Sequence, residues 1–143
     1  MPITNAIPAF GTLLKRGDGA TPEVFTAIAE VGDIAGPSLK SQMEDATNHG
    51  STGGYTESMP TVKSMGQLKF PISFIPSNAT HSAVAGMIYD WVNKTKRNYQ
   101  MVFPDGTVWT LPVYVAEFSL KAPVKTLLVA DVALEITGAP TLA

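Results

Sequence analysis

Residues 99–120 read YQMVFPDGTVWTLPVYVAEFSL, two apolar runs separated by a Pro-Asp-Gly turn. In such a turn proline presets φ and glycine accepts a positive φ, so the segment predicts a β-hairpin. One side of the second run carries Trp109, Leu111, Val113 and Val115, and the other carries Tyr114, Ala116, Phe118 and Leu120. Apolar side chains on both faces indicate that both are covered, either within the domain or by another subunit.

Further strands are predicted on either side of this hairpin. Residues 67–75 and 125–137 alternate apolar and polar side chains with the period of two that a half-buried strand requires. Pro71 lies within the first of these segments and cannot donate a ladder hydrogen bond, so we expect an edge strand or a bulge there. Residues 12–16 and 23–34 are also expected to form strands, the second of them ending at Gly36 and Pro37.

Residues 79–95 change period and predict the single helix. The apolar side chains Val84, Met87, Ile88, Trp91 and Val92 follow the spacing of an amphipathic helix. Asp90 and Lys94 are spaced to form an i,i+4 ion pair on it. We therefore expect one domain over residues 1–143, mainly β, with two packed antiparallel sheets (a β-sandwich or open barrel), one flanking α-helix and one long protruding loop.

Residues 41–64 form the protruding loop in this prediction. The segment is rich in serine, threonine and glycine and contains few large apolar residues, so it cannot bury enough surface to fold by itself. It does contain Met43, Tyr55 and Met59, which would have no role in a simple linker. We expect a loop or hairpin that becomes ordered against a partner, and we expect residues 1–11 to form an extended N-terminal arm.

Composition and motifs argue against chemistry at a catalytic site. The chain has 143 residues, no cysteine and a formal charge of −2, without the basic excess typical of nucleic-acid binding. His49 and His81 have no further ligands at metal spacing, and we expect both in solvent. No nucleophile, phosphate or dinucleotide motif stands out, so the prediction is a protein that is not an enzyme and has no cofactor and no metal. No signal peptide or membrane-spanning run is apparent.

The ordered set of these features resembles the major tail tube proteins of long-tailed, siphovirus-type bacteriophages. The resemblance covers nearly the whole chain and rests on residues 11–19, 25–37, 46–57, 103–109 and 132–138. It implies hexameric rings that stack into a tail tube, through which DNA passes without specific binding. The implied partners are other copies of the chain, the tape-measure and tail terminator proteins and the baseplate or tail-tip proteins, with no membrane.

The resemblance also implies which segments make subunit contacts and where the protein is located. The long loop and the terminal arm would make contacts within or between rings, and for the loop we name Met43, Thr47, Tyr55 and Met59 as the expected subunit-interface residues. The protein would be made in the host bacterial cytoplasm and end in the virion tail. Three alternatives stay open: a ring-forming tail terminator, the tube protein of a contractile injection system, or a monomeric ligand-binding β-module.

Overall fold

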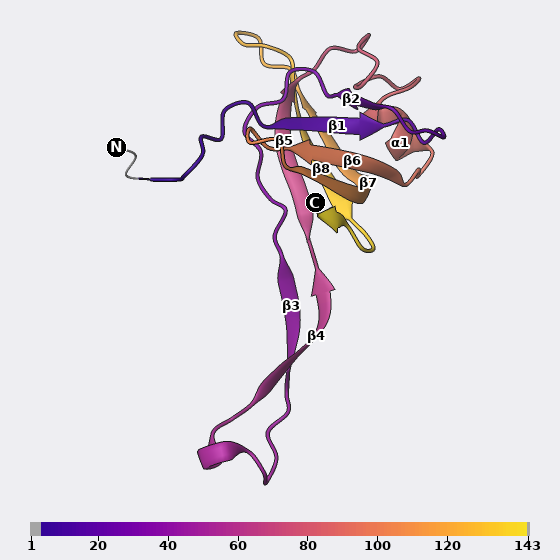
Figure 1. Cartoon of the computed structure of the whole chain (residues 1–143). Helices are drawn as coiled ribbons and strands as arrows, with labels where there is room; N and C mark the ends of the chain where they lie inside the picture. The colour runs from indigo at the N-terminus through magenta and orange to yellow at the C-terminus, as the bar shows by residue number, and fades with distance from the viewer. Residues whose placement is uncertain (1–3, 143) are drawn as a thin grey trace.

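The computed structural model describes residues 4–142 and shows a mainly β fold with one α-helix in that range (Figure 1). Its main sheet is antiparallel and has seven strands. Neighbouring strands follow the order β2 (Phe25–Ala27), β1 (Leu13–Gly17), β6 (Arg97–Val102), β7 (Val108–Lys121), β8 (Val129–Ile136) and β5 (Gln67–Ser73). The seventh strand, β9 (Thr141–Leu142), pairs with β7. A second, two-stranded sheet consists of β3 (Lys40–Asp45) and β4 (Ser58–Ser64). The predicted mainly β class with antiparallel sheets is confirmed.

Strand β7 gives the main sheet its shape because it changes partner along its 14 residues. Residues 108–113 pair with β6, and residues 113–121 pair with β8, with an irregular register between Val115 and Glu117. A bulge of this kind bends and twists a strand. The sheet curves strongly in consequence but does not close into a barrel. The Pro-Asp-Gly turn joins β6 to β7 as the sequence predicts.

The core lies on the concave side of this sheet, where the alternating strands place their apolar residues. Leu68 and Ile72 of β5 and Leu134 of β8 are almost completely buried, as the period of two predicts. The buried cluster contains Leu14, Ile28, Met65, Leu68, Phe70, Ile72, Met87, Tyr99, Met101, Leu111, Val113, Val115, Ala130, Val132, Leu134 and Ile136. Pro71 lies on β5, an end strand of the main ladder, so the predicted edge position is confirmed.

The strand predicted over residues 23–34 is wrong in its extent, because β2 ends at Ala27. Glu30 has a φ of 58°, which turns the chain out of the sheet. The following residues cross to the opposite edge, where the Gly32 N–H donates to the Pro71 carbonyl at 2.8 Å. Ala35 and Lys69 exchange two backbone hydrogen bonds of 2.8 Å. The segment therefore crosses from the edge of the sheet at β2 to the edge at β5 before the chain continues into β3.

The helix predicted over residues 79–95 is also shorter, since α1 spans only Met87–Val92. The residues before it form consecutive turns held by local hydrogen bonds, among them Asn78 Oδ1 accepting from the Thr80 N–H at 2.9 Å. Asparagine and threonine side chains compete in this way with helical backbone bonds. Val84, expected on the buried stripe, is 83% exposed on these turns.

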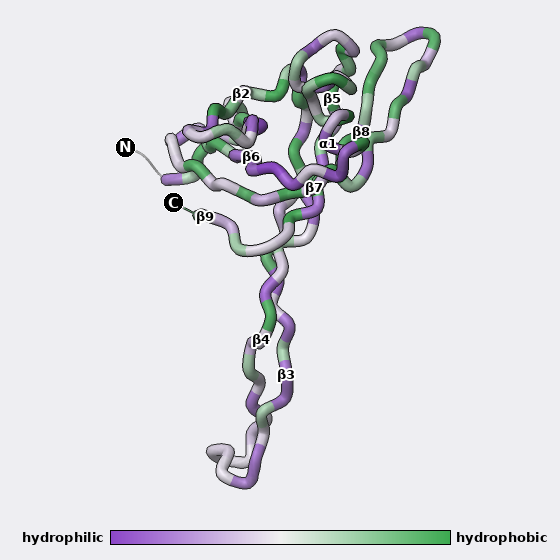
Figure 2. The backbone as a smooth tube through the Cα atoms, turned by 90° about the vertical axis from the view of Figure 1, so that its right-hand side faces the viewer, coloured by the Kyte–Doolittle hydropathy of each residue, from purple (hydrophilic) through white to green (hydrophobic). Residues whose placement is uncertain are grey.

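The segment predicted as a protruding loop is the β3–β4 hairpin, which extends far from the main sheet (Figures 1 and 2). It leaves the body at Gly36, whose φ of 97° and close approach to the Gln67 carbonyl leave no room for a Cβ. A short 3₁₀ turn, η1 (Thr52–Gly54), lies at its tip. Of the predicted N-terminal arm, residues 4–8 have no regular structure, and residues 1–3 lie outside the described part.

Candidate assembly surfaces

The β3–β4 hairpin lies almost entirely in solvent. Every residue of both strands is exposed to solvent, although the two strands pair with each other over most of their length. Three of the predicted interface residues present large apolar side chains, with exposed fractions of 53% for Met43, 78% for Tyr55 and 57% for Met59. A two-stranded hairpin alone is at best marginally stable in water. Its exposure therefore marks it as a surface that a partner would cover.

The register of the hairpin divides its side chains between two faces. Met43 pairs with Pro60, whereas the next pair is Glu44 with Met59. Paired residues share a face and successive residues alternate, so Met43 and Met59 lie on opposite faces. Asp45 and Ser58 share the side with Met43 and Pro60. We call the other side, with Glu44, Glu57 and Met59, the acidic face.

The tip of the hairpin is ordered by its own polar groups. The Thr47 N–H donates to Asp45 Oδ1 at 2.8 Å, and Thr47 Oγ1 accepts from the Glu57 N–H at 2.8 Å. The hydrogen bonds from Thr47 hold the pKa of Asp45 below its usual value. Ser51 donates to Glu57 Oε2 at 2.9 Å. Thr47 thus has a structural role in the tip, while its contact with a neighbouring subunit stays a prediction, as it does for the other three residues.

A second apolar surface lies where α1 packs on the outer half of β7. Trp91 and Val92 of α1 are 54% and 58% exposed, and Tyr114 and Leu120 of β7 are also exposed. Trp91, Val92, Lys94 and Tyr114 line a hollow of about 570 Å³. The sequence indicated this surface only through the apolar side chains on both faces of residues 108–120; Trp91 was expected on a buried helix stripe.

The N-terminal arm contributes a third apolar surface. Ile7 and Phe10 stand largely exposed beside Phe103 at the start of the β6–β7 turn and Ile34 of the crossing segment. Together these segments enclose a hollow of about 810 Å³. The arm therefore lies beside an open apolar hollow, which agrees with its predicted role in subunit contacts without testing it.

A buried ionic cluster holds α1 against the sheet. Asp90 is 1% exposed and accepts two hydrogen bonds of 2.7 Å from Arg16 of β1 and one of 2.8 Å from Arg97 of β6. The Tyr99 hydroxyl donates to the same carboxylate at 3.2 Å. The predicted pair of Asp90 with Lys94 is wrong, because the short helix turns Asp90 inward to these arginines.

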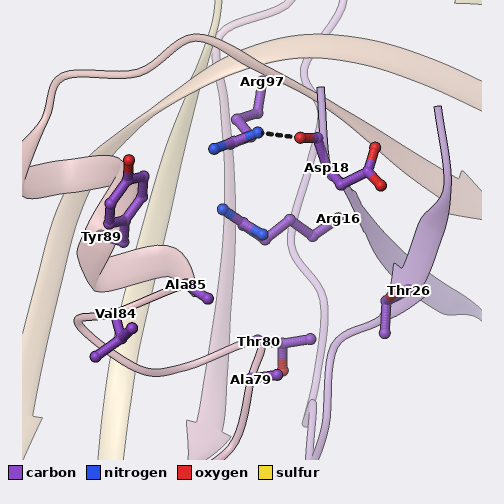
Figure 3. A pocket seen from close by; sticks show the side chains of 9 residues that line it. All are labelled: Arg16, Asp18, Thr26, Ala79, Thr80, Val84, Ala85, Tyr89 and Arg97. Carbon is purple, nitrogen blue, oxygen red and sulfur yellow. Dashed lines mark hydrogen bonds between the residues drawn. The ribbon is translucent and has the colours of Figure 1, made fainter. Parts of the chain in front are cut away.

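The hollow beside this cluster, about 400 Å³, is shown in Figure 3. Arg97 reaches across it to donate to the Asp18 carbonyl at 2.6 Å, and Arg16 lies next to it (Figure 3). Burial alone would lower the pKa of Arg16, but its hydrogen bonds to Asp90 and the negative charge of Asp90 outweigh burial, so the pKa is raised. Burial also raises the pKa of Tyr99. Neither group can exchange protons near neutral pH, so the cluster is suited to structure and not to acid–base catalysis.

The two histidines have different environments. His49 lies exposed in the hairpin tip as expected, but the expectation for His81 is wrong because its side chain is completely buried. Its Nδ1 accepts from the Ile75 N–H at 3.2 Å, so Nε2 carries the proton and donates to the Ala29 carbonyl at 2.8 Å. His81 therefore links the turns before α1 to the crossing segment.

Residues 4–142 contain no cluster of side chains suited to hold a metal ion, and no helix there is long and apolar enough to cross a membrane.

The whole fold is similar to chains in solved structures of phage-like tail assemblies. A chain in "Virion of native gene transfer agent (GTA) particle" is 17% identical, with a TM-score of 0.74 over 96% of this chain and 99% of that one. A chain in "Tail of empty GTA particle computed with helical refinement, C6 symmetry" is 19% identical, with a TM-score of 0.76 over 96% and 99%. A chain in an extracellular contractile injection system, "PVC sheath/tube terminator in extended state", is 11% identical, with a TM-score of 0.70 over 99% of each chain. At these identities the similarity shows the fold alone.

The sequence itself assigns the family. Residues 14–143 match the family described as "Lambda phage tail tube protein, TTP", so the chain belongs to the lambda phage tail tube protein family. A search of curated proteins gives no match. The resemblance noted in the sequence is thus confirmed, and the chain has a structural role in a tail tube of the virion.

Proposed function

We propose that this chain assembles into hexameric rings, that the rings stack into the phage tail tube, and that DNA passes through the tube at ejection. The observation that carries the proposal is the β3–β4 hairpin, whose strands lie entirely in solvent and expose Met43 and Met59 on opposite faces. Such a hairpin gains stability when a neighbouring subunit covers it. The C6 symmetry of the similar gene transfer agent tail supports a ring of six.

The outer half of β7 supports the closure of such a ring. Residues 114–121 pair with β8 on one side, while β6 reaches only as far as the pair of Arg97 with Val113. A strand edge with free N–H and C=O groups can pair with another chain. In a hexamer, pairing at this edge would help to join the sheets of neighbouring subunits into a continuous wall.

The small negative charge suits a tube that conducts DNA without holding it. A formal charge of −2 gives little net attraction to phosphate groups. The proposed partners besides the chain itself are the tape-measure, tail terminator and baseplate or tail-tip proteins. Synthesis would take place in the cytoplasm of the bacterial host, before assembly into the virion tail.

A tail terminator is the second candidate, supported by the fold similarity to the contractile injection system's sheath/tube terminator. A tube protein presents complementary surfaces on both ends of its ring and continues to stack. A terminator stops at one ring. The two candidates therefore differ in whether assembly continues with increasing concentration.

Light scattering coupled to size-exclusion chromatography, followed by negative-stain electron microscopy of each fraction, tests the proposal. We expect rings and hollow tubes of uniform bore, with tube length increasing with concentration or after addition of tail-tip components as a nucleus. Single rings under all conditions would support the terminator. A monomer at every concentration, with and without the nucleus, would contradict both and favour a ligand-binding module.

A further inference from the structure

The acidic face of the hairpin combines one large apolar side chain with negative charge. Met59 is paired with Glu44. Glu57 precedes Met59 by two residues, so alternation places it on the same face, where its carboxylate also accepts from Ser51. Of the three acidic residues of the hairpin, Glu44 and Glu57 lie on this face, and its two lysines, Lys40 and Lys63, lie at the base. Within the described range, Glu44 forms no salt bridge. This face therefore suits a partner surface that offers an apolar hollow beside positive charge.

The hollow at the end of α1 has this complementary chemistry. Trp91, Val92 and Tyr114 form its apolar lining, and Lys94 lies on it. Lys96 is exposed two residues further along the chain. In the part of the chain that the structure describes, neither lysine forms a salt bridge, and Asp90, a carboxylate in the lining of the hollow, is bound by Arg16 and Arg97. At about 570 Å³ the hollow can receive a methionine side chain.

We propose that Met59 of one copy inserts into this hollow of a second copy, with Glu44 and Glu57 facing Lys94 and Lys96. Methionine adapts to irregular hollows, and its sulfur interacts favourably with aromatic rings such as those of Trp91 and Tyr114. Opposite charges on the rim orient the encounter and favour this register over others. This inference rests on the proposed function, because it names the contact through which subunits of the tube recognise each other.

The contact has to be made between two molecules. In Figure 1 the hairpin projects from the body on the side away from α1, so its tip and the hollow of the same chain lie far apart. A contact between two different surfaces is heterologous, and each copy then still presents a free hairpin or a free hollow. A further copy can bind at each free surface, so the contact can be repeated around a ring or from ring to ring, as a tube requires.

A charge exchange tests the pairing. We expect Glu44→Lys and Lys94→Glu, each alone, to raise the critical concentration for tube assembly roughly tenfold at low salt, and the double exchange to restore it to within about threefold of wild type. Lys125→Glu, which reverses another exposed lysine, in the β7–β8 loop, is the matched control. It should leave assembly unchanged and should not rescue Glu44→Lys.

Cysteine crosslinking tests the insertion of Met59 directly, because the chain has no cysteine of its own. A chain with Met59→Cys and Val92→Cys, assembled and oxidised, should give a ladder of multimers on non-reducing gels, and neither single variant should give more than dimers. Both positions are more than half exposed, so folding should be retained, and circular dichroism checks this. Tubes that form without charge rescue and without the ladder would overturn this contact and leave the tube function intact. A wild-type chain that never forms tubes would overturn the proposed function, and the contact with it.

Discussion

The main sheet and the β3–β4 hairpin are both antiparallel β-structure, yet they differ completely in what surrounds them. In the main sheet, Leu68, Leu111 and Leu134 are fully buried, and each strand pairs within a curved sheet around one core. In the hairpin all strand residues are exposed. The difference is consistent with a division of work, in which the sheet stabilises the subunit and the hairpin, in the proposed assembly, would gain its apolar contacts from neighbouring subunits. Changes in the two regions should therefore have effects of different kinds.

The largest effect on subunit stability is expected from Asp90→Ala, which leaves Arg16 and Arg97 partly buried without their partner. Removing one partner of a buried ion pair costs about 3–5 kcal/mol. Lys121→Ala is the control, because its pair with Asp131 is exposed and should contribute less than about 1 kcal/mol. Urea denaturation of both variants measures the difference, and equal losses would contradict a structural role for the cluster.

A direct comparison of the two regions uses the same kind of truncation in each. Leu134→Ala should lower the free energy of unfolding of the subunit by about 2–5 kcal/mol, because it opens a cavity in the core. Met59→Ala should change it by less than about 0.5 kcal/mol, since its side chain is already in solvent. Chemical denaturation of unassembled subunits checks both values. A clear loss of stability in Met59→Ala would mean that the hairpin packs on its own subunit.

The smallest expected effect is a pH dependence confined to the hairpin tip. Hydrogen bonds from Thr47 lower the pKa of Asp45, so their stabilising contribution is present above the unfolded pKa of about 3.9 and is lost as the pH falls through the folded value. We expect amide hydrogen exchange at Thr47 to accelerate, relative to its intrinsic rate, below about pH 4 while the core strands stay protected. In Asp45→Asn this pH dependence should disappear. An unchanged dependence in that variant would assign it to another group.

Much of the main sheet could be predicted because alternation with a period of two survives wherever one face of a strand is buried. This identified β5 and β8, whereas the Pro-Asp-Gly turn identified the β6–β7 hairpin and the missing N–H of Pro71 placed it at an edge. The same reasoning failed for residues 23–34, because it cannot see the positive φ of Glu30 or the crossing to β5. An alternating pattern also describes a segment that passes over the core outside the sheet.

The errors around α1 have a common cause in long-range polar contacts. From its sequence neighbours Asp90 is expected to pair with Lys94, but its partners are Arg16 and Arg97. His81 is expected in solvent, but it is buried and hydrogen-bonds to Ala29. Contacts between residues so far apart in the chain leave no local signal. By contrast, the exposed hairpin was predictable from composition alone, because residues 41–64 contain too few apolar side chains to form a core.

The central claim is that the hairpin serves assembly, and one change tests it most directly. Ser41 pairs with Lys63, so an Asn-Gly turn can replace residues 42–62 while the base of the hairpin keeps its register. The shortened chain lacks Met43, Thr47, Tyr55 and Met59. We predict a folded monomer with the denaturation midpoint of the wild-type subunit and no tubes in negative-stain electron microscopy at any concentration. Tubes of normal bore from the shortened chain would contradict the account.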